Sequence, residues 1–538
     1  MFKWLAKILN GQTKNQAALS SGQQWKDESE IETRSLSKHI DQNREIIEEI
    51  FDHCDDLIIH EFVLGADKKA KAMLVYIDSL IKDDLLQTGL MQALLNIHHE
   101  SVRESSLAWI RERVIPTGKV KEENRWVEVS EGICTSAVAL FIDGQKTALL
   151  IELPEASNRP VSQPITQTSV TGPAEAFNED LHTNMGLLRR RFPTSRLAVE
   201  SMQIGLISKT PVNLVYLKGY VRNGLLDEVK ERLNRIKVDS ILCSGQIDEH
   251  LQDSAYSLFT GIDSTERPDR VASILLEGGV SLIIGGTPFA LLLPTTLATH
   301  MTASDDYDYR YWYASFIRLI RWSALFVAAL APALYVALIS FHQELIPPSL
   351  LVTVVSNREG VPFPAFLEAL LMELSFETLR EAGVRLPRTF GQTISIVGTI
   401  VIGQAAVSAG LVSSGMVVVV ALTAIASYTI PSIKLSNAIR ILRFFFMFAG
   451  AVLGLFGIMA AVSLLSFHLC SLRTFGIPYL SPLAPLSLGD LKDTFVRVPH
   501  WMMQNRPRLT GYAELDRQDP ALKPGPPHGK TDRRKGKI

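Results

Sequence analysis

Residues 322–341, with the sequence WSALFVAALAPALYVALISF, decide the fold of this chain. A helix needs about 20 apolar residues to cross the roughly 30 Å apolar core of a bilayer, and this stretch reaches that length without a charge. Three comparable runs follow at residues 394–412, 416–433 and 444–467. Because a chain in lipid must satisfy its backbone hydrogen bonds internally, we expect an α-helical membrane domain of about four spans.

The composition of the whole chain averages this apolar part with a polar one. Of the 538 residues, 47% are hydrophobic, and the net charge of −2 gives no argument for nucleic acid or for an acidic substrate. The four cysteines are far apart and lack the spacing of metal ligands, which is typical of a reduced cytosolic protein. The first residues do not resemble a secretory signal, so we expect the soluble part to stay in the cytoplasm.

The residues before the first apolar run predict a soluble head of two lobes. Short β-rich runs alternate with helical ones, which is typical of an α/β or α+β fold. We expect a flexible arm at 1–45, a first lobe at 46–130 and a second lobe at 131–304. Asp143 and Gly144 predict a hairpin between the β-rich runs 133–142 and 147–153.

Two pieces near the end of the head, 271–276 and 280–293, are apolar enough to suggest a further span. Glycine pairs at 278–279 and 285–286 break them into strand-length pieces. We therefore predict strands of a β-meander here, and a further strand at 240–243.

Polar segments frame the apolar region on both sides. Residues 305–321 carry four tyrosines, a tryptophan and three arginines, which is the composition of a collar at a membrane surface. The membrane domain then takes up 322–467, and a cytoplasmic tail, partly disordered toward its basic end, takes up 468–538. Four spans put both chain ends on one side and leave three basic residues on the other, against the rule that basic residues face the cytoplasm. These are Lys434, Arg440 and Arg443.

Residues 359–387 predict a charged helix between the first and second apolar runs. Pro362 and Pro364 stand at its entrance, where a missing backbone N–H costs little. Its charges are too many for an ordinary span, so we expect an amphipathic helix that lies in the interface or re-enters against protein. Glu368 and Glu373 are then either the solvated charges of an interfacial helix or, in several copies of the chain, a ring of carboxylates at a pore mouth.

The second apolar run has two distinct faces. Small residues that permit close helix packing are Gly398, Gly403 and Gly410. The candidates for pore lining or helix packing on the other face, continued in the third run, are Val397, Val401, Gln404, Ser408, Thr423 and Ser427. Because an amide is costly in contact with lipid, Gln404 either bonds to a neighbouring helix or lines a water-filled path.

Catalytic and cofactor motifs are missing from the sequence. It has no phosphate-binding loop, no dinucleotide-binding glycine pattern and no nucleophile elbow. His98, His99 and Glu100 are better explained as a polar helix end than as metal ligands, because adjacent histidines on a helix diverge by about 100°. The arginines at 189–191 are likewise expected to be a solvated helix end rather than an anion site. We expect no enzyme activity, no cofactor, no metal and no nucleic acid.

Several motifs resemble those of one family, the A subunits of the GerA-type spore germination receptors. The motifs are EGVPFPAFLE at 359–368, LREAGVRLP at 379–387, GQAA at 403–406, TAIA at 423–426, GPAEAFNEDL at 172–181, Asn184 with LLRRR at 187–191, STERPD at 264–269, GTPF at 286–289 and DLKDT at 490–494. They follow the family's order over nearly the whole chain, from about residue 40 to 510. The chain departs from the family pattern at Ala174, Gly279 and Gly285, where charged residues are expected.

The resemblance implies a nutrient receptor in the inner membrane of a bacterial spore. The A-type subunit would act beside a transporter-like B-type subunit and a C-type lipoprotein, with both of its termini in the spore core. It would also oligomerise, as a pentamer by the family's example, into a ligand-gated cation channel that starts germination. The alternative is a non-conducting scaffold that anchors a transporter-like, nutrient-binding partner. A monomeric transporter is disfavoured, because four spans without an inverted repeat are too few.

Overall fold

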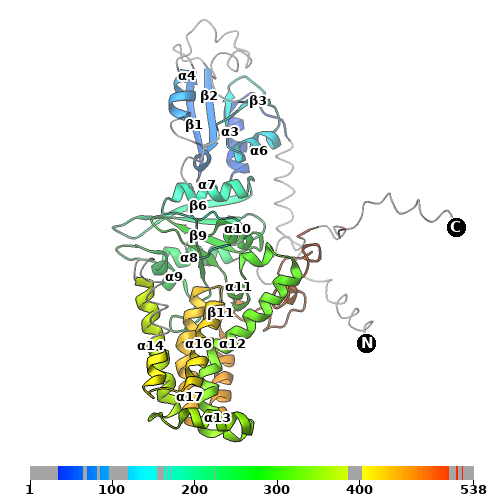
Figure 1. Ribbon diagram of the computed structural model, residues 1–538. Helices are drawn as coiled ribbons and strands as arrows, with labels where there is room; N and C mark the ends of the chain where they lie inside the picture. Colours follow the sequence, from blue (N-terminus) through cyan, green and yellow to red (C-terminus); the bar gives the residue numbers. More distant parts are fainter. Residues whose placement is uncertain are drawn as a thin grey trace, which may run out of the picture.

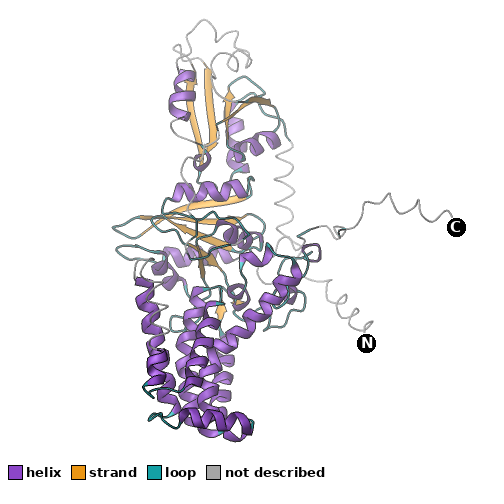
Figure 2. Cartoon of the chain, in the orientation of Figure 1, coloured by secondary structure: helices purple, strands orange, loops and turns teal. Residues whose placement is uncertain are grey.

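The computed structural model describes residues 34–64, 70–81, 85–95, 119–153, 163–164, 166–169, 171–222, 224–385, 403–507, 517–518 and 524. Two β-sheets with their helices form a head, and a group of long helices extends from one end of it (Figures 1 and 2). The mixed α/β head followed by helices agrees with the fold class expected from the sequence.

The first sheet has five antiparallel strands in the order β1-β2-β4-β5-β3. The strands are β1 Leu57–Leu64, β2 Ala70–Ile77, β3 Val120–Glu123, β4 Ala137–Ile142 and β5 Ala148–Glu152. Successive side chains of a strand point to opposite faces. Met73 and Val75 therefore pack with α3 Ile40–Ile50 and α6 Trp126–Cys134, whereas Leu74 packs with η2 Leu85–Met91 and α4 Gln92–Leu95.

This first sheet includes residues that the sequence placed in the second lobe. Because β4 and β5 pair with β2 and β3, the division between the sheets falls after Leu153 and not at 131. The predicted strand at 133–142 begins only at β4. Its first residues belong to α6, in which Trp126, Val129 and Ile133 are buried at helical spacing.

The second sheet has five antiparallel strands in the order β6-β7-β9-β10-β8. The strands are β6 Leu197–Ile204, β7 Thr210–Leu217, β8 Asp263–Thr265, β9 Val280–Ile284 and β10 Ala290–Leu293. One face packs with α7 Leu181–Arg191 and α10 Pro268–Leu276, and the other with α8 Leu225–Asn234 and α9 Ser244–Leu251. The short helix α11 Leu297–Met301 follows the last strand.

Two strand predictions in this lobe are wrong. Residues 271–276 belong to α10, which has Pro268 at its first turn and buries Val271, Ile274 and Leu275 at helical spacing. Residues 240–243 form no strand and lead directly into α9. A short apolar run fits a strand and a buried helix face equally well, so the capping residues were the better guide.

Helix α7 lies between the two sheets and joins them (Figure 1). Arg189 is fully buried, and its Nε and Nη2 donate to the carboxylate of Asp56 at 2.8 and 2.6 Å. The arginines at 189–191 are therefore not a solvated helix end throughout, as the sequence predicted. The first of them is an internal ion pair, and Arg191 pairs with Glu175 at 2.8 Å.

The helical part consists of α12 Tyr311–Phe341, α13 Pro348–Arg358, α14 Ala365–Arg385, α16 Ser414–Tyr428 and α17 Ile433–Ser471. Within the described ranges, α12 and α17 have the length and apolar composition to cross a membrane, and α16 is a shorter apolar helix. Most of the second predicted span, 394–402, lies outside the described residues. The described helices thus do not establish four spans. Helix α14 stands beside α16 and α17 and runs along the bundle toward the head, so the charged helix packs against protein and neither lies in an interface nor re-enters (Figure 1).

Helix α17 folds back on itself at Gly454. This residue has φ +63° and ψ −142°, a conformation that is open essentially only to glycine. A Cβ placed on Gly457 would clash with the carbonyl oxygen of Ala449, eight residues earlier, which is impossible in a continuous helix. Both ends of α17 also contact the head, since Lys434 bonds to Asp248 and His468 lies 3.1 Å from the hydroxyl of Ser257.

The structure corrects the expected sidedness of the basic residues. The first limb of α17 begins at the head, so Lys434 and Arg440 lie on the head side rather than opposite it. Gly454 lies at the far end, next to Phe341 and His342 at the end of α12. The conflict with the charge rule arose because the sequence did not count α14 as a crossing of the bundle, although α14 runs from Glu368, near Arg358 at the far end, to Arg380 beside the head.

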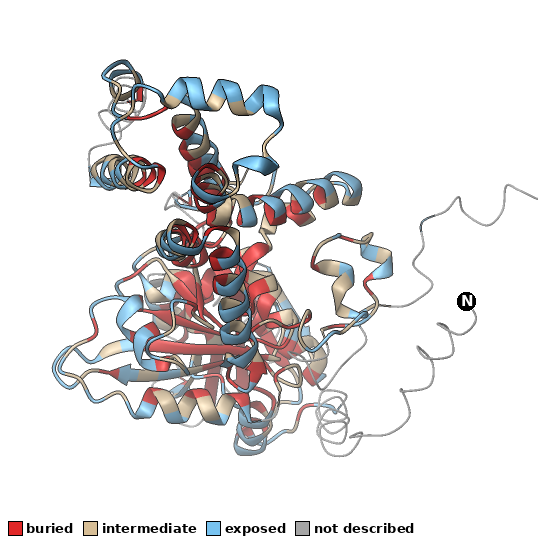
Figure 3. Ribbon diagram, turned by 90° about the horizontal axis from the view of Figure 1, so that it is seen from below, coloured by how far each residue is buried: buried red, intermediate tan, exposed pale blue. Residues whose placement is uncertain are grey.

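The surfaces of the helices are unusually apolar. Buried residues fill the head and the inner faces of the helices, whereas the outer faces are exposed (Figure 3). Exposed large apolar side chains on the helices include Phe326, Val418, Ile425, Phe456, Met459 and Leu464, each more than 60% exposed. Soluble proteins rarely leave patches of this extent uncovered, so these faces are suited to lipid or to other subunits.

The segment after α17 returns to the head. It contains the short strands β11 Arg473–Thr474 and β12 Ile477–Pro478 and the 3₁₀ turns η6 Asp490–Asp493 and η7 His500–Met502. Arg506 donates to the carbonyl oxygen of Leu276 at 2.9 Å and stacks on the ring of Tyr220. The predicted tail is therefore packed against the head up to about residue 507.

Candidate functional site in the helical bundle

Arg443 is the central cation of the bundle. It lies in the first limb of α17 and is 1% exposed. Its Nη1 donates to Oε2 of Glu373 on α14 at 2.6 Å, and its Nη2 donates to Oγ of Ser427 on α16 at 2.6 Å. Its Nε donates to the carbonyl oxygen of Ala328 on α12 at 2.8 Å. One side chain therefore connects four helices.

A second carboxylate, Glu368, is held at the far end of the bundle. Its Oε1 accepts hydrogen bonds from the backbone N–H of Ser413, at 2.6 Å, and from the hydroxyl of the same residue. The other oxygen lies 3.5 Å from Nε of Arg358 on α13. The hydroxyl of Tyr335 on α12 is 3.1 Å from that of Ser413, so this cluster also joins several helices.

These two clusters place charge where apolar side chains surround it. Glu368 and Glu373 are both fully buried, and Oε1 of Glu373 has no hydrogen-bond partner among the described residues. Leaving such a group without its partner costs several kcal/mol, whereas a complete pair is near neutral. Charged residues of this kind in a membrane domain are commonly functional and face the interior of the bundle.

The predicted site residues fall into separate places. Glu368 and Glu373 face the bundle interior, neither solvated at an interface nor open to solvent in one copy of the chain. Thr423 and Ser427 are also buried and take part in helix contacts. Pro362 and Pro364 directly precede α14.

The residues of the second apolar run are only partly described. Gln404 and Ser408 lie exposed on a helical segment, Gly403 is buried near Val417, and Gly410 has φ +65° beside the carbonyl oxygen of Gly360. Val397, Gly398 and Val401 lie outside the described residues. The structure thus brings Glu373 and Ser427 together through Arg443, whereas the hydroxyl of Thr423 bonds within α16, and Gln404 and Ser408 lie on a different surface.

Arg443 itself was missed as a site residue. The sequence placed it among the basic residues that broke the charge rule. Its position directly before the apolar run 444–467 was the available signal, because an arginine at the edge of a span needs a partner. Which carboxylate it meets depends on the packing of α14, which the sequence left open between two arrangements.

The start of α17 is bonded to the head. The hydroxyl of Ser432 donates to Oδ1 of Asp263 at 3.0 Å and lies 2.9 Å from Nδ1 of His300. Arg270 completes this buried cluster at 2.5 Å from Oδ2 of Asp263. Burial alone would raise the pKa of Asp263, but Arg270 and His300 outweigh it and lower that pKa below its usual range.

Lys434 adds a second link between α17 and the head. Its Nζ donates to Oδ2 of Asp248 at 2.9 Å and to the carbonyl oxygen of Ile262 at 3.0 Å. Lys434 and Arg443 are nine positions apart on one helical limb. The contacts with Asp248 and Asp263 of the head and the cation at the centre of the bundle therefore lie on one continuous helical limb.

A third connection joins α12, the head and the returning C-terminal segment. The carboxylate of Asp306 accepts from Nε of Arg318 and from Nη1 of Arg321, both at 2.9 Å. Arg318 also donates to Asp493 at 2.6 Å, and the hydroxyl of Tyr307 donates to Asp493 at 2.6 Å. Burial opposes ionisation of Asp306, but the two arginines lower its pKa overall.

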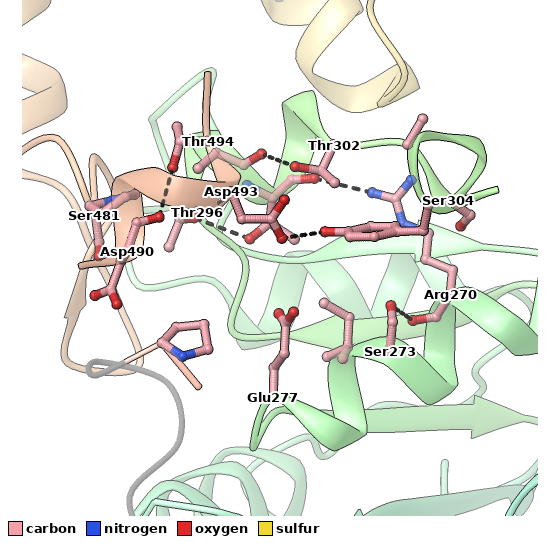
Figure 4. A pocket seen from close by; sticks show the side chains of 17 residues that line it. Arg270, Ser273, Glu277, Thr296, Thr302, Ser304, Ser481, Asp490, Asp493 and Thr494 are labelled. Atoms are coloured by element: carbon pink, nitrogen blue, oxygen red, sulfur yellow. Dashed lines mark hydrogen bonds between the residues drawn. The ribbon is translucent and has the colours of Figure 1, made fainter. Parts of the chain in front are cut away.

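A small polar cavity of about 120 Å³ adjoins this junction. It lies between α10, the segment after β10 and the C-terminal segment, and Glu277 points into it below Asp493 (Figure 4). Burial and the nearby Asp493 raise the pKa of Glu277 to about 7. This carboxyl therefore changes its charge near neutral pH.

Comparison with known proteins decides the family. Residues 45–509 match the family described as Bacillus/Clostridium GerA spore germination protein. The chain belongs to the GerA family of spore germination proteins. The resemblance found in the sequence motifs is thereby confirmed over nearly the whole chain.

Individual relatives cover most of the chain. Spore germination protein KA of Bacillus subtilis is 40% identical over 505 residues, covering 94% of this chain and 92% of that protein. Spore germination protein A1 of the same organism is 41% identical over 378 residues, covering 70% and 78%. A crystal structure of the N-terminal domain of the A subunit of the Bacillus megaterium spore germinant receptor GerK3 matches with 29% identity and a TM-score of 0.39. That match covers 48% of this chain and 96% of that one.

Two departures from the family motifs have a steric explanation in this chain. A Cβ on Gly285 would lie 2.9 Å from Cγ of Pro211, and one on Gly279 would lie 2.5 Å from a methyl group of Ile274. Charged side chains at either position would require neighbouring residues to move. Ala174 is exposed, and nothing in the structure explains its departure.

Proposed function

We propose that this GerA-family chain is the integral membrane A-type subunit of a nutrient-sensing spore germination receptor, and that several copies form a ligand-gated cation channel. The observation that carries the proposal is the continuity between head and bundle. Ser432 and Lys434 bind the first turn of α17 to the head, and Arg443 on the same limb holds α12, α14 and α16. A change in the head can therefore alter helix packing without an additional element.

An assembly of several copies fits the exposed surfaces. Among the described residues, the interior of one bundle is filled by apolar side chains and the Arg443 cluster, which favours a path between copies over one within a single chain. Apolar outer faces are available for lipid and for neighbouring subunits. Gln404 and Ser408 are exposed polar residues on such a face, and we propose that they line the path between copies, with Glu368 and the Pro362–Pro364 turn as gating elements.

The family resemblance supplies the proposed partners and location. We propose a transporter-like B-type subunit and a C-type lipoprotein as partners, and a homo-oligomer, taken as a pentamer. The proposed location is the inner membrane of the spore, crossed several times, with both termini in the spore core. Both ends of α17 lie at the head, which supports a C-terminal segment on the same side as the head.

Cation release from spores tests the receptor role. Spores that lack this gene should release no cations in response to the receptor's nutrient, and release should return when the gene is restored. Unchanged release without the gene would contradict the proposal. Gln404→Leu should reduce release in assembled receptors without changing protein abundance, because it removes an exposed amide from the proposed path.

The alternative function is a non-conducting scaffold that anchors a nutrient-binding partner. The buried Glu373–Arg443 pair favours it, because a structural pair of this kind is also what a rigid anchor needs. Purified protein in liposomes loaded with a potassium-sensitive dye separates the two functions. A channel subunit passes ions when it is assembled and activated, whereas a scaffold passes none under any condition.

A further inference from the structure

A larger cavity lies where the head meets the helices. Its volume is about 720 Å³, within the usual range of ligand sites. Its walls come from the head, from the last turns of α14 and α16 and from the first turns of α17. Arg443 and Glu373 are not among its lining residues, and Ser427 is the residue that it shares with the Arg443 cluster.

The lining of this cavity is strongly basic. Five arginines line it, and Asp305 is the one acidic residue among the lining residues. The arginines are Arg267, Arg270, Arg321, Arg380 and Arg440. The first turn of α17 lines it as well, and the N–H groups of a first helical turn have no partners within the helix. Both features favour an anion.

Three of these arginines are already neutralised by aspartates of the head. Arg270 pairs with Asp263, Arg321 with Asp306, and Arg267 with Asp269 and Asp305. They form a wall of satisfied ion pairs. The positive charge that remains lies on the other two arginines.

Arg380 and Arg440 share a single carboxylate. Glu377 accepts from Nε of Arg380 at 2.8 Å, but Nε of Arg440 is 3.9 Å from its other oxygen, which is beyond hydrogen-bond distance. That oxygen has no hydrogen-bond partner among the described residues. Arg440 donates to the side chain of Asn437 and lies over the ring of Tyr428. Among the described residues, two guanidinium groups with one carboxylate leave one positive charge uncompensated beside the cavity.

Exposed aromatic residues occur at the head end of the apolar helices, where the cavity also lies. Tyr428 lines it and is 64% exposed, and Trp312 and Tyr313 at the start of α12 are also exposed. Exposed aromatic residues at the ends of apolar helices are typical of the lipid headgroup zone. The apolar side chains of Ile430 and Ile433 line the same cavity, so it has both a basic and an apolar wall.

We propose that this cavity binds the phosphate group of an anionic phospholipid from the leaflet that faces the head, with Arg380 and Arg440 as its contacts. Guanidinium groups bind phosphate through paired N–H donors, and basic pockets between membrane helices bind anionic headgroups. The apolar wall accommodates the beginning of the acyl chains. Binding there ties the last turn of α14 to the first turns of α17, next to the head.

Lipid-dependent thermal unfolding of the full chain tests this proposal. The purified protein in neutral detergent is titrated with phosphatidylglycerol, with phosphatidylcholine or with inorganic phosphate, and Tm is recorded, since a ligand that binds only the folded state raises Tm. Phosphatidylglycerol should raise Tm more than phosphatidylcholine, and phosphate alone should have little effect. An equal effect of the two lipids would overturn the proposal, and an equal effect of phosphate would assign the site to a free anion.

Variants identify the residues. Arg380→Gln and Arg440→Gln should each raise the half-saturating amount of phosphatidylglycerol about tenfold, the usual effect of losing a hydrogen bond to a charged group. Arg385→Gln is the matched control, because Arg385 is on the same helix, is 78% exposed in its side chain and is not among the lining residues. If all three variants behave alike, the site is not this cavity.

A variant that should bind phosphatidylglycerol more tightly makes the test independent of folding defects, because a misfolded protein would bind it less tightly. Glu377→Gln removes the carboxylate that competes for both arginines, so it should lower the half-saturating amount of phosphatidylglycerol. The number of phosphatidylglycerol molecules retained per chain in native mass spectrometry gives the same comparison without unfolding. Weaker retention in Glu377→Gln than in the unaltered protein would contradict the proposal.

Discussion

The bundle and the head–helix junction both contain buried arginines, but they are built differently. In the bundle, Arg443 meets one carboxylate, Glu373, and its other partners are uncharged. At the junction, Asp306 meets two arginines, and Arg318 also meets Asp493. Loss of Arg443 or Glu373 leaves the other without any counter-charge, whereas at the junction the three charges that remain still include an opposite charge. We therefore expect the bundle to be fragile to single substitutions and the junction to be tolerant.

The largest expected effect is that of Arg443→Met. The substitution leaves Glu373 buried without a counter-charge and removes the donors to Ala328 and Ser427, so we expect a loss of about 4 kcal/mol in the free energy of unfolding. Thermal unfolding of the purified protein in detergent measures it. The double variant Arg443→Met/Glu373→Leu is the control and should recover most of the loss, because a buried pair can be replaced by apolar residues. Additive losses would show that the pair is not the cause.

Gly454→Ala should have the next largest effect, because the fold-back of α17 depends on this residue. Its φ of +63° is strained for any other residue, and the new Cβ would lie 2.7 Å from the ring of His342. We expect a loss of about 3 kcal/mol. Gly489→Ala is a suitable control, since a Cβ there meets no atom within 4 Å. Equal stability of the two variants would argue against the hairpin.

A smaller loss is expected from Asp306→Asn at the junction. The amide still accepts a hydrogen bond, and Arg318 keeps Asp493, so we expect a loss of about 2 kcal/mol. The same unfolding assay compares it directly with Arg443→Met. A loss as large as that of Arg443→Met would contradict the expected difference between the junction, which has several charged partners, and the bundle, where Arg443 has one.

The smallest effect is a dependence on pH that Glu277 should confer. Because its pKa in the folded chain is raised to about 7, its neutral form stabilises the fold fully below the unfolded pKa of about 4.5, and this contribution is lost as pH rises through about 7. Glu277→Gln removes the dependence. Between pH 4.5 and pH 8 the unaltered protein should lose about 2 kcal/mol more than the variant. Identical pH profiles would show that Glu277 does not titrate in this range.

The sequence predicted the α/β head, the apolar helices and the family, because those follow from local patterns. Hydrophobic periodicity and the hairpin at Gly144 are properties of neighbouring residues. The predicted strand at 271–276 was wrong because a short apolar run fits two structures. The run 444–467 was counted as one span, whereas the chain turns back at Gly454. A glycine within a long apolar run predicts close packing and a turn equally well.

The candidate site was predictable only in part. Glu373 and Ser427 were singled out because polar groups are costly in lipid, and the structure places both next to Arg443. Their partner could not be predicted, since Arg443 lies 70 residues from Glu373 and the contact depends on how α14 packs. The basic cavity could not be predicted for the same reason, because Arg380 and Arg440 approach one carboxylate only in the folded bundle.

The central claim is that the head acts on the bundle through the start of α17. Nutrient-triggered cation release from spores that carry Lys434→Met tests it most directly, because this substitution removes the bonds to Asp248 and Ile262 and leaves the Arg443 cluster unaltered. Lys237→Met, at an exposed position of the head, is the control. At equal protein abundance, we expect release about tenfold slower in Lys434→Met and unchanged in Lys237→Met, since about 1.4 kcal/mol of lost coupling corresponds to tenfold. Normal release from Lys434→Met spores would contradict the account.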